Sequence, residues 1–381
     1  MPSTQSNVEP AFRKTTETFR TGAKSLAQRY FVSPEIFAQE QRKIFSEQWI
    51  LVGHQSQIPK GGDYFISEVA GESLIVVRDQ RSATRGFYNV CRHRGTRLRE
   101  DPSGHVPAIQ CPYHAWTYGL DGRLIGAPHM DGVPGFDKAD YSLHPVNLGL
   151  WEGFIFVNLA SASTSRSDRG HMSLEEWFAQ LARKFPNLPK LRSAKRIDYN
   201  VQANWKLIFE NYSECYHCPG VHPTLSKLSP YDSAENDLTE GPFLGGFMRI
   251  TKGNSLTMSG KSCALPIGDF RDFDRIFYYS IFPNMLLSLH PDYVMVHQLR
   301  PLSPDRTLIL CDWFFNPEAF ERADFKPDDA IEFWDMTNKQ DWHVCELSQQ
   351  GIASRAYEPG PYSPRESIPA AWDREYLHHL S

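Results

Sequence analysis

Short apolar runs dominate the chain between Trp49 and about Asn158. The segments 73–77 and 153–157 are examples, and Gly, Pro and Asp residues separate such runs from one another. Apolar runs of this length between turn residues are typical of strands in an antiparallel sheet. The pattern therefore predicts a small all-β domain over residues 45–160.

Helical and strand-like patterns alternate after residue 160. Polar residues and Gly predict a boundary loop at 161–171. Apolar residues at helical spacing predict helices over about 174–184, 204–216 and 328–350. Strands are expected between these helices, near 196–201, 277–282, 285–288, 294–299 and 308–315. This order predicts an α+β fold for residues 161–381, with an antiparallel sheet covered on one side by helices.

Residues 1–44 are predicted to form a polar leader and one helix that packs on the larger domain. Ser33-Pro34-Glu35 is a helix start signal, because it stands directly before the apolar residues Ile36 and Phe37. The leader lacks the apolar core of a secretory signal, so we expect a cytoplasmic protein.

Composition narrows the possible partners. The chain has 381 residues, of which 41% are hydrophobic and 22% charged, as expected for a globular protein. A formal net charge of -5 gives no reason to expect nucleic acid as a partner, and no apolar run is long enough to span a bilayer. Seven cysteines, an odd number without an export signal, argue against a disulfide framework and leave thiols free for metal.

Two short Cys–His pairs form the first candidate metal site. Cys91-Arg92-His93 and Cys111-Pro112-Tyr113-His114 are separated by the 17 residues 94–110. Structural zinc sites usually pair Cys with Cys and His with His. One Cys and one His in each pair instead suits a [2Fe–2S] cluster with both Cys on one iron and both His on the other. A zinc ribbon, or two unrelated buried pairs, remain the alternatives.

The first site resembles the Rieske signature. Its second pair is followed by Ala-Trp-Thr-Tyr-Gly-Leu-Asp-Gly at 115–122, with Ala115 where many members of the family have Gly. The chain is similar to the oxygenase component, or α subunit, of Rieske-type non-haem iron oxygenases. This resemblance implies a Rieske domain at 45–160 and a helix-grip-like catalytic domain with a mononuclear iron at 161–381.

A second candidate site follows Asn211 in the sequence Asn-Tyr-Ser-Glu-Cys-Tyr-His-Cys-Pro-Gly-Val-His. We expect Glu214 and His217 to share a helix face, because they are three residues apart, and Pro219-Gly220 to end that helix. The chain can then return so that His222 joins His217. Two such histidines need one carboxylate to complete the 2-His-1-carboxylate set of oxygen-activating iron(II) enzymes.

The carboxylate should come from the helix predicted near the end of the chain. Asp341 shares a mostly apolar face with Trp334 and Cys345, and we predict it as the third iron ligand. Asp335 stands four residues before Lys339, which more often indicates a solvated ion pair, although it stays open as the alternative.

The resemblance also implies a path for electrons. In the family, an acidic residue beside the iron histidines links the cluster of one subunit to the iron of the next subunit in a trimer. Glu214 matches that position, although most members have Asp there, and it would join His114 of one subunit to His217 of the next. Glu214 and Asn211 are therefore our candidate catalytic residues.

The sequence around Glu214, together with segments near Tyr278 and Phe333, resembles the branch of this oxygenase family that demethylates glycine betaine and stachydrine. That likeness implies oxidative N-demethylation of a quaternary ammonium substrate with O2. A separate flavin and iron–sulfur reductase must pass electrons from NAD(P)H, because the chain shows no Gly-rich dinucleotide motif. Hydroxylation or O-demethylation of an aromatic acid is the nearest alternative, and a Rieske electron carrier without oxygenase activity is another.

Overall fold

The computed structural model describes residues 11–160, 173–179, 181, 188–267 and 273–381. The chain divides into two compact units. The large unit holds the described residues up to Phe37 together with Arg192–Ser381, and the small unit is Ala38–Leu191. Residues 38–44 and the described part of 161–191 thus group with the small unit, unlike our predicted boundaries. Helix α2 (Pro34–Glu40) crosses residue 37 without a break, so no sequence signal marks that boundary.

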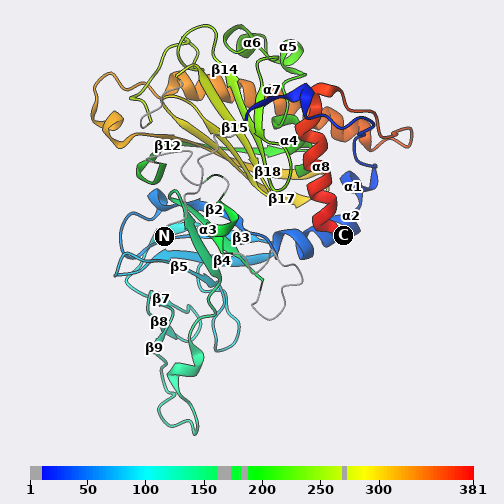
Figure 1. The fold of residues 1–381 in the computed structure, drawn as a ribbon. Coiled ribbons are helices and arrows are strands. Elements are labelled where there is room, and N and C mark those ends of the chain that lie inside the picture. The colour runs from blue at the N-terminus through cyan, green and yellow to red at the C-terminus, as the bar shows by residue number, and fades with distance from the viewer. Residues whose placement is uncertain (1–10, 161–172, 180, 182–187, 268–272) are drawn as a thin grey trace, which may run out of the picture. The chain divides into compact units, whose positions relative to one another are not determined.

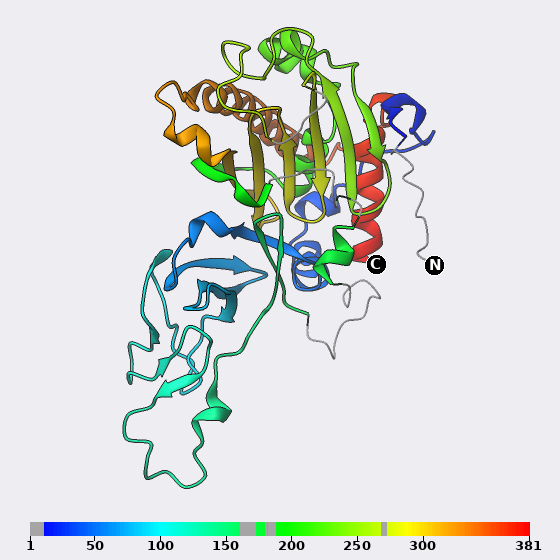
Figure 2. The ribbon, with the colours of Figure 1, turned by 60° about the vertical axis from the view of Figure 1, so that its left-hand side comes forward.

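An eight-stranded antiparallel sheet forms the centre of the large unit (Figures 1 and 2). Its strands, in spatial order, are β1 (Arg13–Lys14), β13 (Glu235–Leu238), β14 (Phe243–Arg249), β15 (Arg275–Ile281), β16 (Met285–Leu289), β17 (Val294–Ser303), β18 (Arg306–Phe315) and β12 (Arg192–Val201). Every residue of β16 is buried, as expected for a central strand between covered faces.

Three helices pack together on this sheet. Helix α4 (Trp205–Tyr212) contacts α7 (Asp328–Ile352), α8 (Ser367–Leu380) and strand β17, and α7 also contacts β12. Figures 1 and 2 show α7 running along one face of the sheet. The shorter helices are α1 (Arg29–Val32), α2, α5 (Cys218–Val221) and α6 (Pro223–Leu228). The predicted α+β class with an antiparallel sheet and helices is confirmed.

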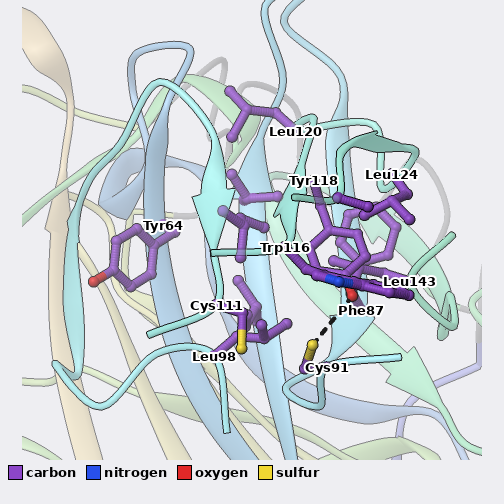
Figure 3. Close-up of a cluster of buried hydrophobic side chains, with 14 residues drawn as sticks. Tyr64, Phe87, Cys91, Leu98, Cys111, Trp116, Tyr118, Leu120, Leu124 and Leu143 are labelled. Carbon is purple, nitrogen blue, oxygen red and sulfur yellow. Dashed lines mark hydrogen bonds between the residues drawn. The ribbon is translucent and has the colours of Figure 1, made fainter. Parts of the chain in front are cut away.

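Short strands form the small unit. They make three antiparallel sheets, namely β10-β11-β2 (Asn147–Trp151, Phe154–Asn158, Ile50–His54), β5-β4-β3-β6 (Thr84–Tyr88, Glu72–Arg78, Asp63–Val69, Ser103–His105) and β7-β8-β9 (Ile109–Gln110, Thr117–Tyr118, Leu124–Gly126). A hydrophobic cluster that includes Tyr64, Phe87, Trp116 and Tyr118 fills its interior (Figure 3).

Two predicted helices differ from the observed ones. The helix expected over 204–216 ends at Tyr212. Helix α3 (Leu174–Trp177) is short, and part of the expected 174–184 helix lies outside the described residues. The start signal at Ser33 is confirmed, because its Oγ accepts a hydrogen bond from Ile36 N–H at 3.2 Å. No described helix has both the length and the hydropathy needed to cross a bilayer.

Candidate active site

The two Cys–His pairs of the small unit lie in loops of the same construction. The backbone N–H of Gly95 donates to the carbonyl of Cys91 at 3.0 Å, and that of Ala115 donates to the carbonyl of Cys111 at 3.2 Å. Gly95 and Ala115 both have a positive φ, +75° and +57°. Ala115 therefore occupies a conformation that favours glycine, at a cost of about 1 kcal/mol, which explains why glycine suits this position.

The cysteine sulfurs lie inside this arrangement and the histidine rings lie nearer the surface. Cys91 and Cys111 are each 3% exposed, and Figure 3 shows their sulfurs on the same side of the hydrophobic cluster. The rings of His93 and His114 are 4.8 Å apart, and His93 stacks on Trp116 with an interplanar angle of 9°. Two inner sulfurs and two outer nitrogens fit a [2Fe–2S] cluster with one iron on each donor pair.

Sequence reasoning missed the hydrogen bond beside this sulfur pair. The hydroxyl of Tyr118 lies 3.3 Å from Cys91 Sγ and accepts the backbone N–H of Arg92 at 3.0 Å. Burial, followed by the contact with Cys91, raises the pKa of Tyr118, so the phenol keeps its proton. It can therefore donate to a thiolate sulfur that ligates metal. The tyrosine inside the Rieske-like segment was the sequence signal for it.

The second candidate site begins where α4 ends. We expected one helix to carry Glu214 and His217 and to end at Pro219-Gly220. This prediction is wrong, because α4 ends before Glu214, and Pro219 and Gly220 lie inside the next helix, α5. The carboxylate of Glu214 accepts the backbone N–H groups of Tyr216 and His217, the latter at 3.3 Å. An acidic side chain that binds nearby backbone N–H groups competes with helical hydrogen bonding, so α4 stops.

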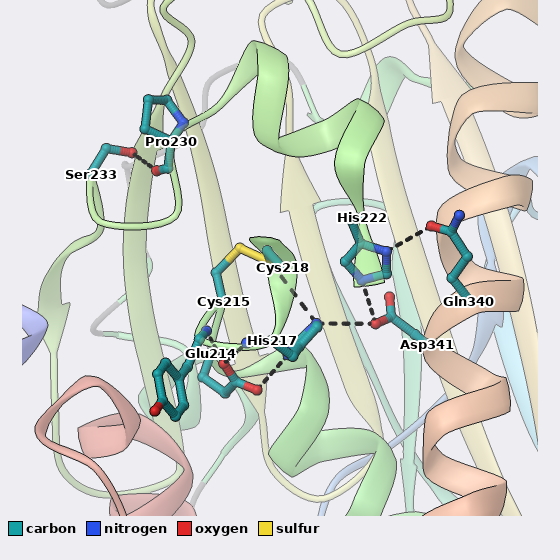
Figure 4. The surroundings of a disulfide bond; sticks show 10 residues. Glu214, Cys215, His217, Cys218, His222, Pro230, Ser233, Gln340 and Asp341 are labelled. Carbon is teal, nitrogen blue, oxygen red and sulfur yellow. Dashed lines mark hydrogen bonds and ion pairs between the residues drawn. A yellow bond between two sulfur atoms is a disulfide. The ribbon is translucent and has the colours of Figure 1, made fainter. Parts of the chain in front are cut away.

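The structure brings His217, His222 and Asp341 together although Asp341 lies on α7. Asp341 Oδ1 is 2.8 Å from His222 Nε2 and 3.2 Å from His217 Nε2. Figure 4 shows the three side chains pointing toward one another. Glu214 Oε1 contacts the other ring nitrogen, Nδ1, of His217 at 2.5 Å. Two imidazoles and one carboxylate that converge in this way match the donor set of a mononuclear iron(II) site.

Two other acidic residues of α7, Asp335 and Glu346, point elsewhere. Asp335 accepts from Lys339 Nζ at 2.6 Å and from the hydroxyl of Tyr199 at 2.9 Å. Glu346 accepts the backbone N–H of Gln202 at 2.9 Å. Neither side chain faces the histidines, so Asp341 is the carboxylate of α7 that the fold offers to a metal.

Gln340 holds the second histidine in place. Its Oε1 lies 2.8 Å from His222 Nδ1, which leaves Nε2 of the same ring directed at Asp341 (Figure 4). A hydrogen bond on one ring nitrogen fixes which nitrogen is free to ligate metal. No sequence pattern pointed to Gln340, because neighbours on a helix project about 100° apart and a direct neighbour of Asp341 is expected to point away.

Hydrogen bonding raises the affinity of His217 for a proton. Burial alone would lower the pKa of His217, but the hydrogen bonds with Asp341 and Glu214 outweigh it and raise the pKa to about 10. Burial opposes the ionisation of Asp341, yet its contacts with His217 and His222 hold its pKa below the usual range. A bound metal cation would take the place of the proton that this negative cluster attracts.

A cysteine also lies beside this site. The donor atoms of His217, Cys218 and His222 lie within 4.8 Å of one another. However, Cys218 Sγ is 3.9 Å from His217 Nε2 and forms a disulfide with Cys215 (Figure 4). A sulfur in a disulfide is not a thiolate, so Asp341 is the better third ligand. The prediction of free thiols is thus wrong for this pair.

A cavity of about 330 Å³ opens onto this site within the large unit. Glu214, His217, His222 and Asp341 line it, and so does Asn211. Aromatic side chains form much of the rest of the wall, namely Tyr212, Tyr216, Tyr231, Phe247, Tyr278 and Trp334. The predicted iron donors and the predicted catalytic residues therefore share one substrate-sized space.

Comparison with protein families gives the two units an identity. The family described as "Rieske [2Fe-2S] domain" matches residues 48–137. The family described as "Ring hydroxylating alpha subunit (catalytic domain)" matches residues 188–381, slightly more than half of the chain. The chain belongs to the Rieske non-haem iron oxygenases. It is an oxygenase α subunit, as the resemblance in the sequence implied.

Relatives of this oxygenase span nearly its whole length. It is 34% identical to the glycine betaine monooxygenase oxygenase subunit of Chromohalobacter salexigens, over 90% of this chain and 83% of the relative. It is 32% identical to the carnitine monooxygenase oxygenase subunit of Escherichia coli (strain K12), over 88% and 86%. A solved quaternary ammonium Rieske monooxygenase superposes with a TM-score of 0.79 at 26% identity, over 97% of this chain and 100% of that chain.

Membership of this family means that the oxygenase carries a [2Fe–2S] cluster and a mononuclear iron. Both donor sets found above fit these groups in number and in chemistry. An iron bound by three donors on one side keeps other positions open, which is how such a site handles dioxygen beside a substrate.

Proposed function

We propose that this oxygenase removes an N-methyl group from a quaternary ammonium zwitterion of the betaine type. The cavity carries this proposal, because it combines the predicted iron donors with an aromatic wall. The relatives named for glycine betaine and carnitine support the same class of substrate. Cys91, His93, Cys111 and His114 would hold the cluster, and the His217–His222–Asp341 set would hold the iron.

The aromatic wall suits a cation without N–H donors. The ring of Tyr278 meets those of Tyr212 and Trp334 edge to face, with centroids 6.0 and 6.4 Å away. Burial raises the pKa of both tyrosines, so their rings stay neutral phenols. The indole N–H of Trp334 donates to Tyr293 at 2.6 Å, which fixes the orientation of its ring. Aromatic faces attract a trimethylammonium group, and the nearby Glu214, which is not among the proposed iron donors, adds to that attraction.

The proposed reaction inserts one oxygen atom into an N-methyl C–H bond. Dioxygen, two electrons and two protons are consumed, one oxygen atom becomes the hydroxyl group and the other leaves as water. The hydroxymethyl ammonium product then loses formaldehyde and a proton, and the tertiary amine remains. The electrons require a separate reductase, which fits the naming of the relatives as oxygenase subunits.

We include in the proposal a homotrimer, in the cytoplasm, in which electrons cross between subunits. His114 Nδ1 is buried and has no hydrogen-bond partner among the described residues. A buried ring nitrogen without a partner is costly, so Nδ1 is the nitrogen that would bind the cluster iron. The other ring nitrogen, Nε2, would then donate to a carboxylate from another copy. Glu214 is suited to that role, because its carboxylate already contacts His217 Nδ1 and retains further acceptor capacity.

A single-turnover experiment tests the proposed reaction without the native reductase. The cluster is reduced chemically, and formaldehyde and cluster oxidation are measured after O2 is added with one substrate. Glycine betaine and carnitine should give about one formaldehyde per oxidised cluster, because the cluster and the mononuclear iron(II) would each supply one of the two electrons. An aromatic methyl ether should give none. Formaldehyde from the ether alone would overturn the proposal in favour of aromatic O-demethylation. Cluster content without mononuclear iron would leave only an electron carrier.

The electron path has its own test. Glu214→Gln should slow substrate-dependent oxidation of the reduced cluster at least about tenfold, because a charge-assisted hydrogen bond contributes about 1.5–3 kcal/mol. Glu332→Gln is the control, since Glu332 is exposed on α7 and does not line the cavity. Stopped-flow absorbance measures both. An unchanged rate in the Glu214 variant would exclude this carboxylate from the path.

A further inference from the structure

The cavity also contains positive charge. Lys14 and Arg365 both line it. Lys14 precedes the 3-10 turn η1 (Thr15–Glu17), and Arg365 lies in the turn η7 (Pro364–Glu366), and these two turns pack against each other. The cavity therefore receives acidic side chains from α7 and from the end of α4, and basic side chains from a second pair of elements.

Arg365 is held in a fixed position. Its guanidinium lies over the ring of Tyr231, 4.9 Å from the ring centroid, and Tyr231 also lines the cavity. The backbone of the turn is fixed as well, because Ser363 Oγ accepts the N–H of Arg365 at 3.2 Å and Glu366 accepts the N–H of Ser363 at 2.6 Å. A guanidinium stacked on an aromatic face loses little freedom when its edge binds a ligand.

The donors at the edge of that guanidinium are available. Arg365 is half-buried, and no ion pair joins it to a carboxylate within the part of the chain that the structure describes. Asp232, the nearest acidic neighbour of Tyr231 in sequence, lines the cavity but is exposed to solvent and forms no such pair in the described structure. A planar fork of N–H donors matches the two oxygens of a carboxylate.

We propose that Arg365 binds the carboxylate of the substrate and so selects zwitterionic betaines over quaternary ammonium alcohols such as choline. This inference rests on the proposed function. The trimethylammonium end lies against the aromatic wall beside the iron donors, and the carboxylate reaches Arg365. Lys14 is exposed and contributes a weaker, screened attraction. A cation without a carboxylate leaves the Arg365 fork unmatched and gains nothing from it.

The test compares two substrates in two variants. Formaldehyde release gives kcat/KM for glycine betaine and for choline with wild type, Arg365→Gln and the control Arg322→Gln. Arg322 is an exposed arginine, paired with Asp324, that does not line the cavity. Loss of a bidentate charge-assisted pair should lower kcat/KM for glycine betaine roughly 10- to 100-fold. The value for choline should stay within about twofold, because choline never uses that pair.

Two further measurements separate a binding role from a structural one. Arg365→Lys should recover part of the loss, since it keeps the charge and loses the fork. Calorimetric titration with glycine betaine should show weaker binding in Arg365→Gln, while its Rieske spectrum stays that of wild type. Equal losses with betaine and choline, or no loss with betaine, would overturn the role of Arg365 alone. A wild type that releases no formaldehyde from any quaternary amine would overturn the proposed function as well.

Discussion

Replacing Tyr118 with Phe removes one hydrogen bond from the proposed cluster ligand Cys91 and leaves the aromatic ring in place. The hydroxyl lies 3.3 Å from a sulfur whose residue is 3% exposed, so water has little access to replace it. Reduction adds negative charge to the cluster, so a donor to its sulfur stabilises the reduced form more than the oxidised form. If this hydrogen bond stabilises the reduced cluster by about 1 kcal/mol more than the oxidised cluster, its removal lowers the one-electron potential by about 40 mV.

A redox titration followed by electron paramagnetic resonance measures this midpoint potential directly in wild type and Tyr118→Phe. Tyr113→Phe is the matched control, because Tyr113 is 56% exposed and stacks on His114, and its hydroxyl bonds to no sulfur among the described residues. The control should stay within about 10 mV of wild type, the equivalent of about 0.2 kcal/mol. An unchanged midpoint in Tyr118→Phe, with full cluster content, would refute the argument that this hydroxyl donates to a cluster ligand.

Three further outcomes follow from the geometry. Asp341→Asn should lower the metal content from about three irons per chain to about two, with the Rieske spectrum kept, whereas Asp335→Asn should retain all three; equal iron loss in both variants would contradict this. Gly245→Ala should lower the free energy of unfolding by at least about 2–4 kcal/mol in urea titration, because its φ is +138° and a Cβ would overlap a backbone oxygen of β15. Gly351→Ala, where nothing lies within 4 Å, should change it by less than about 1 kcal/mol, and similar effects at both glycines would refute the overlap. The pKa of His217 is raised to about 10 in the metal-free site, so iron(II) must displace a proton when it binds. The affinity of the site for iron(II) should therefore rise up to about tenfold per pH unit between about pH 7 and 9. An anaerobic iron titration that gives the same affinity at each pH would contradict the raised pKa.

Local sequence patterns predicted the features that depend on neighbours in the chain. The strand pattern of the small unit and the long helix near the end of the chain follow from periodicity, and α7 was expected within two residues of its observed ends. The Cys–His loops follow from spacing alone, because each loop is closed by hydrogen bonds between residues a few positions apart. The end of α4 was predicted wrongly, since a propensity argument could not foresee that Glu214 binds the backbone beyond it.

The residues of the chain limit the metal chemistry of both sites, because donor types and their spacing in short segments restrict what they can bind. The choice between Asp341 and Asp335, which the sequence left open, depends on the fold. Asp341 and His222 are 119 residues apart, and the packing of α4 against α7 brings them within hydrogen-bond distance. The same holds for the contact of Gln340 with His222, for the aromatic wall and for Arg365, because each joins parts of the chain that are far apart in the sequence. Chain spacing carries no information about such contacts, because they arise when distant apolar faces are buried against one sheet.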